Sequence, residues 1–435
     1  MAKSGARSER CLWSRRAREP ERAGLTEAPP RSRRRPDVVP VKGFDGLVLY
    51  AFVVLGLPDG TIGTAWPVLR KGFGAPLGDL GIFLLVGTLG SLLSSSVAGL
   101  LFARLGTRVM VMLGGTAGAL GALGAVLSPS FWAFAASGSL IGVAAGLLDS
   151  TANTAVALTG RNRLLNMLHG SYGVGTTIAP LIATAAILAG SWRGSYAAVL
   201  GAELVLVAAW WFAGRLAQRA SSQGPQVPAG GPGGASGDLA TAGAKAPASR
   251  RRLAVLIGLG LAVFMVYTGL EVSAGQWAPS FDRAVLHMGA GATGLATFGY
   301  WGALTLARFA LAVPRRPVPP AAVVRWGCAV GFVGAALVWW RPEAVVALVG
   351  LVVLAAALAG VFPALIALTP ARVGEDVAHH VIGWQIGAAG LGGSAISAAM
   401  GLAFQRFGLG ELGLALVVVA ALLVVGSFVL ERVAR

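Results

Sequence analysis

The sequence predicts an all-α, polytopic membrane protein with twelve transmembrane helices, arranged as two parallel repeats of six. The first observation is composition: of 435 residues, 55% are hydrophobic and only 12% are charged, and the mean hydropathy is +0.72. The second is a series of apolar windows about 20 residues long, the length that a helix needs to cross a bilayer. The third is a set of motifs that occurs once in each half of the chain.

The apolar windows are continuous, whereas the strands of a membrane barrel are short and alternate in polarity, so the windows favour helices. We place six helices in each half. The first six are expected over residues 45–66, 78–103, 107–127, 131–158, 168–190 and 194–215. The second six are expected over residues 253–278, 289–313, 320–340, 343–369, 377–404 and 409–431.

Three polar segments flank and divide these helices. Residues 1–44 are basic and lack an apolar run, which is typical of a disordered cytoplasmic tail. Residues 216–252 are rich in Gly, Pro, Ala and Ser and are expected to form a flexible cytoplasmic linker. Residues 432–435 form a short cytoplasmic C-terminus. The two six-helix halves are therefore residues 45–215 and 253–431.

The positive charge is distributed unevenly among the connections. If both termini lie in the cytoplasm, the inner connections carry more than twice as many Lys and Arg residues as the outer ones. Cytoplasmic loops of membrane proteins retain positive charge, so the chain is expected in the cytoplasmic membrane with its N- and C-termini inside. This distribution accounts for the formal net charge of +17 without a nucleic-acid partner.

The internal repeat involves two different pairs of helices. The first span contains "DGTIGTAWP", starting at Asp59, and the seventh contains "EVSAGQWAP", starting at Glu271. The fifth span contains "GSYGVGTT", starting at Gly170, and the eleventh contains "GAAGLGGS", starting at Gly387. The two matches are separated by nearly the same length of chain, which indicates a duplicated six-helix unit. Small residues at these positions are typical of closely packed membrane helices.

A duplicated six-helix unit is one way in which secondary transporters are built. The sequence also resembles the major facilitator superfamily in the loop after the second span, which reads "GLLFARLGTR" from Gly99 to Arg108. Ala103 stands where that superfamily usually has an aspartate. The resemblance implies the major facilitator fold, whereas the gating contact made by the missing aspartate is not expected here.

Residues in the fourth and fifth spans are similar to the fucose:proton symporter family. The segment is "GLLDSTANTAVALTGRNRLLNMLHGSYGVG", and "VYTGLEVSAGQW" in the seventh span also resembles that family. The resemblance implies that carboxylates in the first and fourth spans serve proton coupling and sugar binding. Asp149 matches the fourth-span acid, while Gly63 stands at the place of the first-span acid and Asp59 lies one turn earlier. The coupling scheme is therefore expected to differ.

Three carboxylic acids are expected near the middle of the membrane: Asp59, Asp149 and Glu271. An ionised carboxylate at the centre of a membrane costs about 3 kcal/mol on insertion scales, so it needs a partner or a use. By sequence position, Arg308 and Arg325 lie near helix ends, and no Lys or Arg is expected at the depth of the acids. Protonation is then the less costly state, which suggests proton coupling. The structural alternative is a hydrogen-bonded acid with no part in transport.

Polar and aromatic side chains near these acids are candidates for substrate binding. Asp149 and Asn153 share a helical face at a spacing of four residues, as do Tyr267 and Glu271. Amides, hydroxyls and aromatic rings suit a sugar, whose edges carry hydroxyls and whose faces are apolar. The candidate substrate-binding residues are Asn153, Asn166, His169, Tyr267, Gln276, Trp277 and Gln385. For His169 and Trp277, a location at the membrane interface is the structural alternative.

These observations lead us to expect a monomeric transporter rather than an enzyme. Its expected partners are a small polar solute, with a sugar as the leading candidate, together with protons and membrane lipid, and no cofactor or metal is expected. "GAGATG" at Gly289 matches a dinucleotide-binding pattern but follows no strand, and His379 and His380 fit a solvated loop. A proton-driven exporter of amphipathic compounds is an open alternative because "GVGTTIAP" resembles an antiporter motif. A receptor or scaffold that does not transport is a third possibility.

Overall fold

The computed structural model describes residues 43–157, 162–221, 250–312, 318–341 and 343–434. Within these ranges the chain is helical and contains no strand, as expected. Nearly all of the predicted tail and most of the predicted linker lie outside the described residues, so those two predictions stay open. The flanking helices do extend into the segment assigned to the linker, because one ends at Ser221 and the next begins at Arg250.

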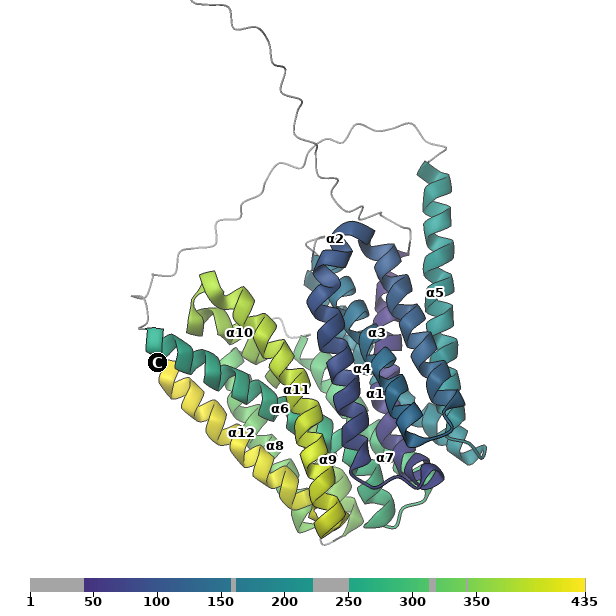
Figure 1. Cartoon of the computed structure of the whole chain (residues 1–435). Coiled ribbons are helices and arrows are strands. Elements are labelled where there is room, and N and C mark those ends of the chain that lie inside the picture. Colours follow the sequence, from purple (N-terminus) through teal and green to yellow (C-terminus); the bar gives the residue numbers. More distant parts are fainter. Residues whose placement is uncertain (1–42, 158–161, 222–249, 313–317, 342, 435) are drawn as a thin grey trace, which may run out of the picture. The chain divides into compact units, whose positions relative to one another are not determined.

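Five helices form the first half of the chain (Figure 1). They are α1 (Phe44–Phe73), α2 (Asp79–Leu127), α3 (Phe131–Ala157), α4 (Asn162–Leu188) and α5 (Arg193–Ser221). Helix α2 contains both the second and the third predicted spans. It changes direction at Gly106, whose φ of 71° and ψ of 171° are not helical. A left-handed φ is readily adopted only by glycine, so Gly106 allows the two spans to follow one another without a separate loop.

The second half begins with α6 and includes a helix that is interrupted. Its helices are α6 (Arg250–Ala284), α7 (Ala290–Ala312), α8 (Pro320–Trp340), α9 (Ala344–Leu358), α10 (Val361–Val373), α11 (Glu375–Phe407) and α12 (Leu412–Ala434), with a short 3-10 turn at Leu409–Glu411. The tenth predicted span, residues 343–369, is divided into α9 and α10 by a break at Ala359 and Gly360. The carbonyl oxygens of Leu358 and Ala359 at this break accept hydrogen bonds from other helices.

Ten helical segments of the described chain are long and apolar enough to cross a membrane. Helix α2 counts once among them although it contains two predicted spans, and α9 and α10 count together. Helix α7 is not among the ten. With α2 counted twice and α7 included, the described helices agree with the twelve-helix prediction.

Glycines allow α1 and α4 to pack with their backbones nearly in contact. A Cβ atom on Gly56 would lie only 2.3 Å from the carbonyl oxygen of Tyr172, and one on Gly175 would lie 2.0 Å from that of Val53. Neither carbonyl can move without displacing its helix. These glycines therefore fix how closely the two helices approach, which is the packing role that small residues have in membranes.

The duplication seen in the sequence is repeated in the helix contacts. Gly175 of α4 packs against Val53 of α1, and Gly392 of α11 packs against Met265 of α6. The two glycines occupy the same place in the fifth-span and eleventh-span motifs. Their partners, Val53 and Met265, precede the acids of the first-span and seventh-span motifs by the same number of positions. The close crossing of α1 and α4 thus has a copy in the second half.

Contacts between the two halves are duplicated as well. In the α4–α7 seam, Gly170 faces Phe309 and Gly173 faces Thr305. The α2–α11 seam has the corresponding contacts, Leu92 with Gly387 and Thr88 with Gly390, and every residue is displaced along the chain by the same number of positions. A contact between α1 and α6 also joins the halves, where Gly63 packs on Gln276.

Candidate functional site

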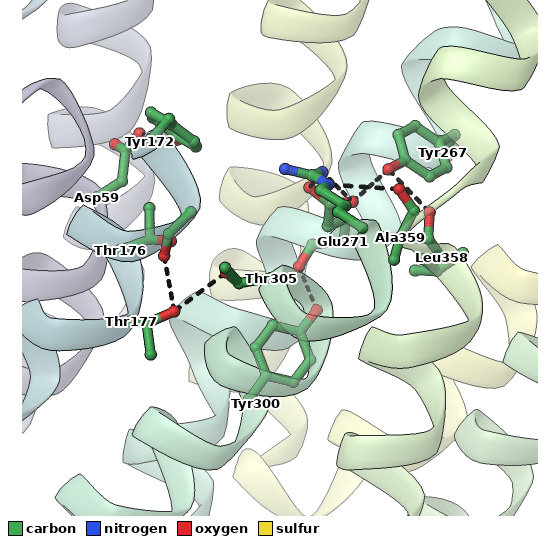
Figure 2. Close-up of polar contacts among 12 residues, drawn as sticks. Asp59, Tyr172, Thr176, Thr177, Tyr267, Glu271, Tyr300, Thr305, Leu358 and Ala359 are labelled. Atoms are coloured by element: carbon green, nitrogen blue, oxygen red, sulfur yellow. Dashed lines mark hydrogen bonds and ion pairs between the residues drawn. The ribbon is translucent and has the colours of Figure 1, made fainter. Parts of the chain in front are cut away.

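Asp59 lies where α1, α4 and α6 meet. Its Oδ2 accepts a hydrogen bond of 2.5 Å from the hydroxyl of Tyr172 on α4 (Figure 2). Its backbone carbonyl oxygen accepts another, of 2.8 Å, from the side-chain amide of Gln276 on α6. The side chain of Asp59 is exposed, although Gly60 and Thr61 beside it are buried. The carboxylate is therefore held in place while remaining accessible.

Glu271 is buried and has a cationic partner. Nη2 of Arg308 on α7 lies 3.2 Å from its Oε1, and the hydroxyl of Tyr267 donates to its Oε2. The hydroxyl of Tyr300 donates to the backbone carbonyl of Glu271 at 2.7 Å (Figure 2). These contacts come from α6 and α7, so the carboxylate is compensated in charge and in hydrogen bonding.

This ion pair corrects the expectation that no Lys or Arg lies at the depth of the acids. Arg308 is only four residues from the end of α7. Side chains of a helix point toward its N-terminus, and the guanidinium of a long arginine can lie well away from its Cα. The charged group of Arg308 thus reaches Glu271, where its Nε also donates to the carbonyl oxygen of Ala359 at 3.3 Å.

Hydroxyl groups lie between the two acids. The Oγ1 atoms of Thr177 on α4 and Thr305 on α7 are 3.1 Å apart (Figure 2). We call this set of groups the central polar layer. It consists of Asp59, Tyr172, Thr177, Thr305, Arg308, Glu271 and Tyr267.

The two acids occupy equivalent positions in the repeat, yet their partners differ. By the offset of the helix contacts above, Tyr172, which donates to the first-half acid, corresponds to Ala389. Arg308, which pairs with the second-half acid, corresponds to Ser91. The first-half carboxylate therefore has a phenol, and the second-half carboxylate has a guanidinium. The two similar positions of the repeat thus carry different chemistry.

Asp149 and Asn153 lie together on α3, as their spacing predicts. The amide of Asn153 donates to Oδ1 of Asp149 at 3.0 Å and to its backbone carbonyl at 2.9 Å. His169 of α4 is exposed, and its ring lies edge-on to Phe52 with 5.9 Å between centroids. Asn166 belongs to α4, but its side chain lies outside the described residues.

Two of the predicted substrate-binding residues lie elsewhere. Trp277 is fully buried, its indole N–H donates to the carbonyl of Ser397 at 3.0 Å, and its ring packs edge-on against Phe404. Gln385 is buried on α11, where it accepts a hydrogen bond of 3.0 Å from Thr369. The described contacts of both residues hold helices of the second half together. We therefore leave them out of the proposed site.

The sequence interpretation missed several groups of the layer. Tyr172 lies inside the repeated motif "GSYGVGTT", where the aromatic residue between the glycines was a usable signal. Thr177 and Thr305 had no distinguishing pattern, because threonines in membrane helices often bond to their own backbone, as Thr177 does with the carbonyl of Gly173.

The number of intramembrane acids was also underestimated. Glu203 of α5 is buried within a predicted span, and Asp282 near the end of α6 is fully buried, so the described helices hold more than the three expected. Gly118 of α2 leaves space for Glu203, since a Cβ there would lie 2.2 Å from its Oε1. Oε2 of Glu203 and both carboxylate oxygens of Asp282 have no hydrogen-bond partner among the described residues.

The sequence model of the major facilitator superfamily matches residues 48–398. The chain belongs to the major facilitator superfamily. Membership makes it a multi-pass membrane transporter rather than an enzyme, with the two-repeat fold described above. The comparison with curated protein sequences gave no match.

Solved structures show the same superfamily fold. The xylose transporter XylE from E. coli, in a partially occluded inward-open conformation, is similar at a TM-score of 0.63 and 13% identity, covering 89% of this chain and 98% of that one. The structure of the proton:xylose symporter XylE bound to 6-bromo-6-deoxy-D-glucose is similar at a TM-score of 0.65 and 12% identity, and the match covers 89% of this chain and 94% of that one. The superfamily transporter FucP in its outward conformation is similar at a TM-score of 0.56 and 16% identity, and the match covers 89% of this chain and 98% of that one. At these identities the likeness concerns the fold.

Proposed function

We propose that this transporter moves a small polar solute, with a sugar as the leading candidate, across the cytoplasmic membrane by proton-coupled alternating access. One observation carries the proposal: the central polar layer holds two acids at equivalent positions, and only the second-half acid has an arginine partner among the described residues. One carboxyl is thus free to change its protonation state, while the other has a fixed charge partner.

Proton coupling is assigned to Asp59 and Asp149. Asp59 is exposed and accepts a hydrogen bond from the Tyr172 phenol, so its carboxylate is held in place while a proton has access to it. Asp149 is partly exposed, and its described partner is the neutral amide of Asn153. Neither acid forms an ion pair in the described part of the chain. Loss of a proton from Asp59 therefore changes the net charge of the central polar layer, and loss of one from Asp149 changes the charge beside Asn153 on α3.

Glu271 takes a different part in the proposal. Separating the Arg308 guanidinium from the Glu271 carboxylate inside a membrane would leave each group without its partner. We therefore assign Glu271 to positioning: it holds the Arg308 guanidinium, whose remaining N–H groups can donate to solute oxygens. Tyr267 shares this task by donating to the same carboxylate.

The polar groups of the layer suit a solute with several hydroxyls. Thr177 and Thr305 supply hydroxyls that donate and accept, and Arg308 supplies donors. The side-chain N–H of Gln276 donates to the backbone carbonyl of Asp59 on α1. Its Oε1 has no partner among the described residues and could accept a hydrogen bond from a solute when α1 and α6 separate. The sugars named for the similar structures make pentoses and hexoses the first class to test.

Transport by the purified chain in proteoliposomes tests the proposal. We expect an imposed pH gradient to drive accumulation of at least one sugar from a panel of pentoses and hexoses, and a protonophore to abolish it. Amphipathic cations belong in the same panel, because their gradient-driven movement without any sugar transport would favour the exporter instead. Sugar uptake that is unaffected by the pH gradient and by the protonophore would contradict proton coupling while leaving the solute class intact.

A further inference from the structure

A pocket of about 350 Å³ lies away from the central polar layer, between α8, α10 and α12. Its lining includes three arginines, Arg325 near the start of α8, Arg372 in the last turn of α10 and Arg432 in the last turn of α12. These are ends of membrane-crossing helices, so the arginines lie at one membrane surface, where the phosphates of lipids are found. The volume is within the range of small-molecule sites.

The pocket rim is positively charged. Among the described lining residues Glu431 is the one carboxylate, and its Oε1 lies 3.7 Å from Nη2 of Arg325. Arg432 stacks over the ring of Phe428, with 4.5 Å between its guanidinium carbon and the ring centroid, which leaves the edge of the guanidinium able to donate hydrogen bonds. The lining thus has two more positive than negative side chains and suits an anion.

The inner wall of the same pocket is apolar. It is formed by Val324, Cys328, Ala329, Val424 and Phe428, which lie on α8 and α12. A free phosphate would gain nothing from this wall. A lipid would gain from both parts, because its phosphate could bind at the arginines while an acyl chain lies along the apolar residues.

The wall continues into apolar surface that a membrane must cover. Trp326 and Val330 of α8 are exposed beside the pocket, as are Leu422 and Val425 of α12. Exposed apolar side chains in a row on helices of this length are the lipid-facing side of a membrane protein. A lipid could therefore enter the pocket from the bilayer without crossing water.

We propose that the cleft between α8, α10 and α12 binds an anionic phospholipid, with the phosphate at Arg372 and Arg432 and an acyl chain along Ala329 and Val424. Basic pockets between membrane helices on the cytoplasmic side recognise anionic headgroups in this way. The site shares no residue with the central polar layer, so it does not depend on the identity of the solute.

The test uses the full chain in nanodiscs of phosphatidylcholine containing a small fraction of phosphatidylglycerol, with retained lipids counted by native mass spectrometry. Wild-type protein should retain phosphatidylglycerol in preference to phosphatidylcholine. Each basic residue is expected to strengthen phosphatidylglycerol binding about fivefold. The preference of the Arg372→Gln/Arg432→Gln variant for phosphatidylglycerol should therefore be about 25-fold weaker than that of the wild type. The matched control is Arg104→Gln/Arg215→Gln, two exposed arginines of the first half, which should retain it.

A second variant keeps the charges and blocks the apolar wall. Ala329 is exposed in the pocket, so Ala329→Phe should fold normally and still exclude the acyl chain. Loss of the phosphatidylglycerol preference in this variant supports a lipid site even if the double arginine variant fails to fold. Wild-type retention in Ala329→Phe, or an equal loss in the control variant, would overturn the proposal. So would displacement of phosphatidylglycerol by an equal concentration of glycerol 3-phosphate, since the site would then be one for a soluble anion.

Discussion

Arg308 and Glu271 form an ion pair that joins α7 to α6, with Nη2 of the arginine 3.2 Å from Oε1 of the glutamate. The carboxylate is mostly buried, and the hydroxyl of Tyr267 donates to it as well. Removing one partner of such a pair leaves the other charge uncompensated, whereas removing both does not.

Glu271→Gln and Arg308→Gln should therefore each lower the thermal stability of the purified protein, by up to about 3 kcal/mol. The double variant should be more stable than the sum of the two single effects predicts. A double-mutant cycle from melting curves in detergent measures this coupling. Strictly additive effects would show that the two groups do not interact in solution.

Asp59→Asn should abolish solute accumulation driven by a pH gradient and leave exchange of solute across the membrane. The amide keeps the size and hydrogen bonding of the carboxyl but cannot release a proton. Accumulation and counterflow, measured in the same proteoliposomes, separate the two activities. Asp376→Asn changes an exposed acid at the start of α11 and serves as the matched control. Gradient-driven accumulation that persists in Asp59→Asn would remove Asp59 from the coupling scheme.

Asp149→Asn tests the second proposed coupling acid in the same assay. We again expect exchange without accumulation, because the described partner of Asp149 is the neutral amide of Asn153. Asn153→Ala removes a hydrogen bond while keeping the acid, so it should slow transport and preserve coupling. If Asn153→Ala lost accumulation and Asp149→Asn kept it, the pair would serve solute binding instead.

Gln276→Ala and Asn166→Ala should each weaken solute binding by about five- to 150-fold, the effect of losing one hydrogen-bonding partner in a buried polar site. Binding titrations on purified protein measure the change, and size-exclusion profiles check that the fold is intact. Thr116→Ala, at an exposed position on α2, is the control. A control variant that binds as weakly as the other two would place the solute elsewhere.

Gly56→Ala should lower the melting temperature and the transport rate, because the added Cβ would lie 2.3 Å from a backbone oxygen of α4. The helices can relieve this contact only by moving apart. Gly46→Ala is a control in the same helix, since a Cβ there meets nothing within 4 Å. Equal melting temperatures for the two variants would mean that the α1–α4 crossing is looser than the structure shows.

Cysteine labelling checks the proposed orientation. In a variant without the two natural cysteines, we expect Ser130→Cys and Ser191→Cys to react with an impermeant thiol reagent from outside the cell, and Glu375→Cys to react only after permeabilisation. All three positions are exposed and lie between or at the ends of helices. The reverse pattern would place the termini outside.

The fold was readable from the sequence because membrane helices depend on composition and length, which a single sequence displays directly. The repeat was readable for the same reason, since Asp59 and Glu271 begin similar motifs. Two helix boundaries could not be predicted from the sequence. Two predicted spans continue through Gly106 as the single helix α2, and the break at Gly360 divides one predicted span into α9 and α10. The first depends on the backbone conformation of one glycine, and the hydropathy pattern records neither boundary.

The candidate site was only partly predictable. Pairs on one helix, such as Asp149 with Asn153, follow from helical spacing and were found. Contacts between helices were missed. The Arg308–Glu271 pair, for example, depends on which faces α6 and α7 turn toward each other and on the length of the arginine side chain. Trp277 was proposed for a sugar site because an aromatic residue beside polar ones suits a sugar by composition, whereas the structure shows its indole N–H bonded to a neighbouring helix, a contact that composition does not reveal.

The two seams between the halves have one further consequence. Because the contacts of Gly173 with Thr305 recur as those of Gly390 with Thr88, the halves meet along two copies of one surface. The two copies are not packed equally, since a Cβ on Gly173 would lie 2.6 Å from Thr305 whereas one on Gly390 would lie 3.8 Å from Thr88. A larger residue would therefore fit at Gly390 and would push the helices apart at Gly173. The duplication thus provides two matching surfaces of which one is closed more tightly than the other.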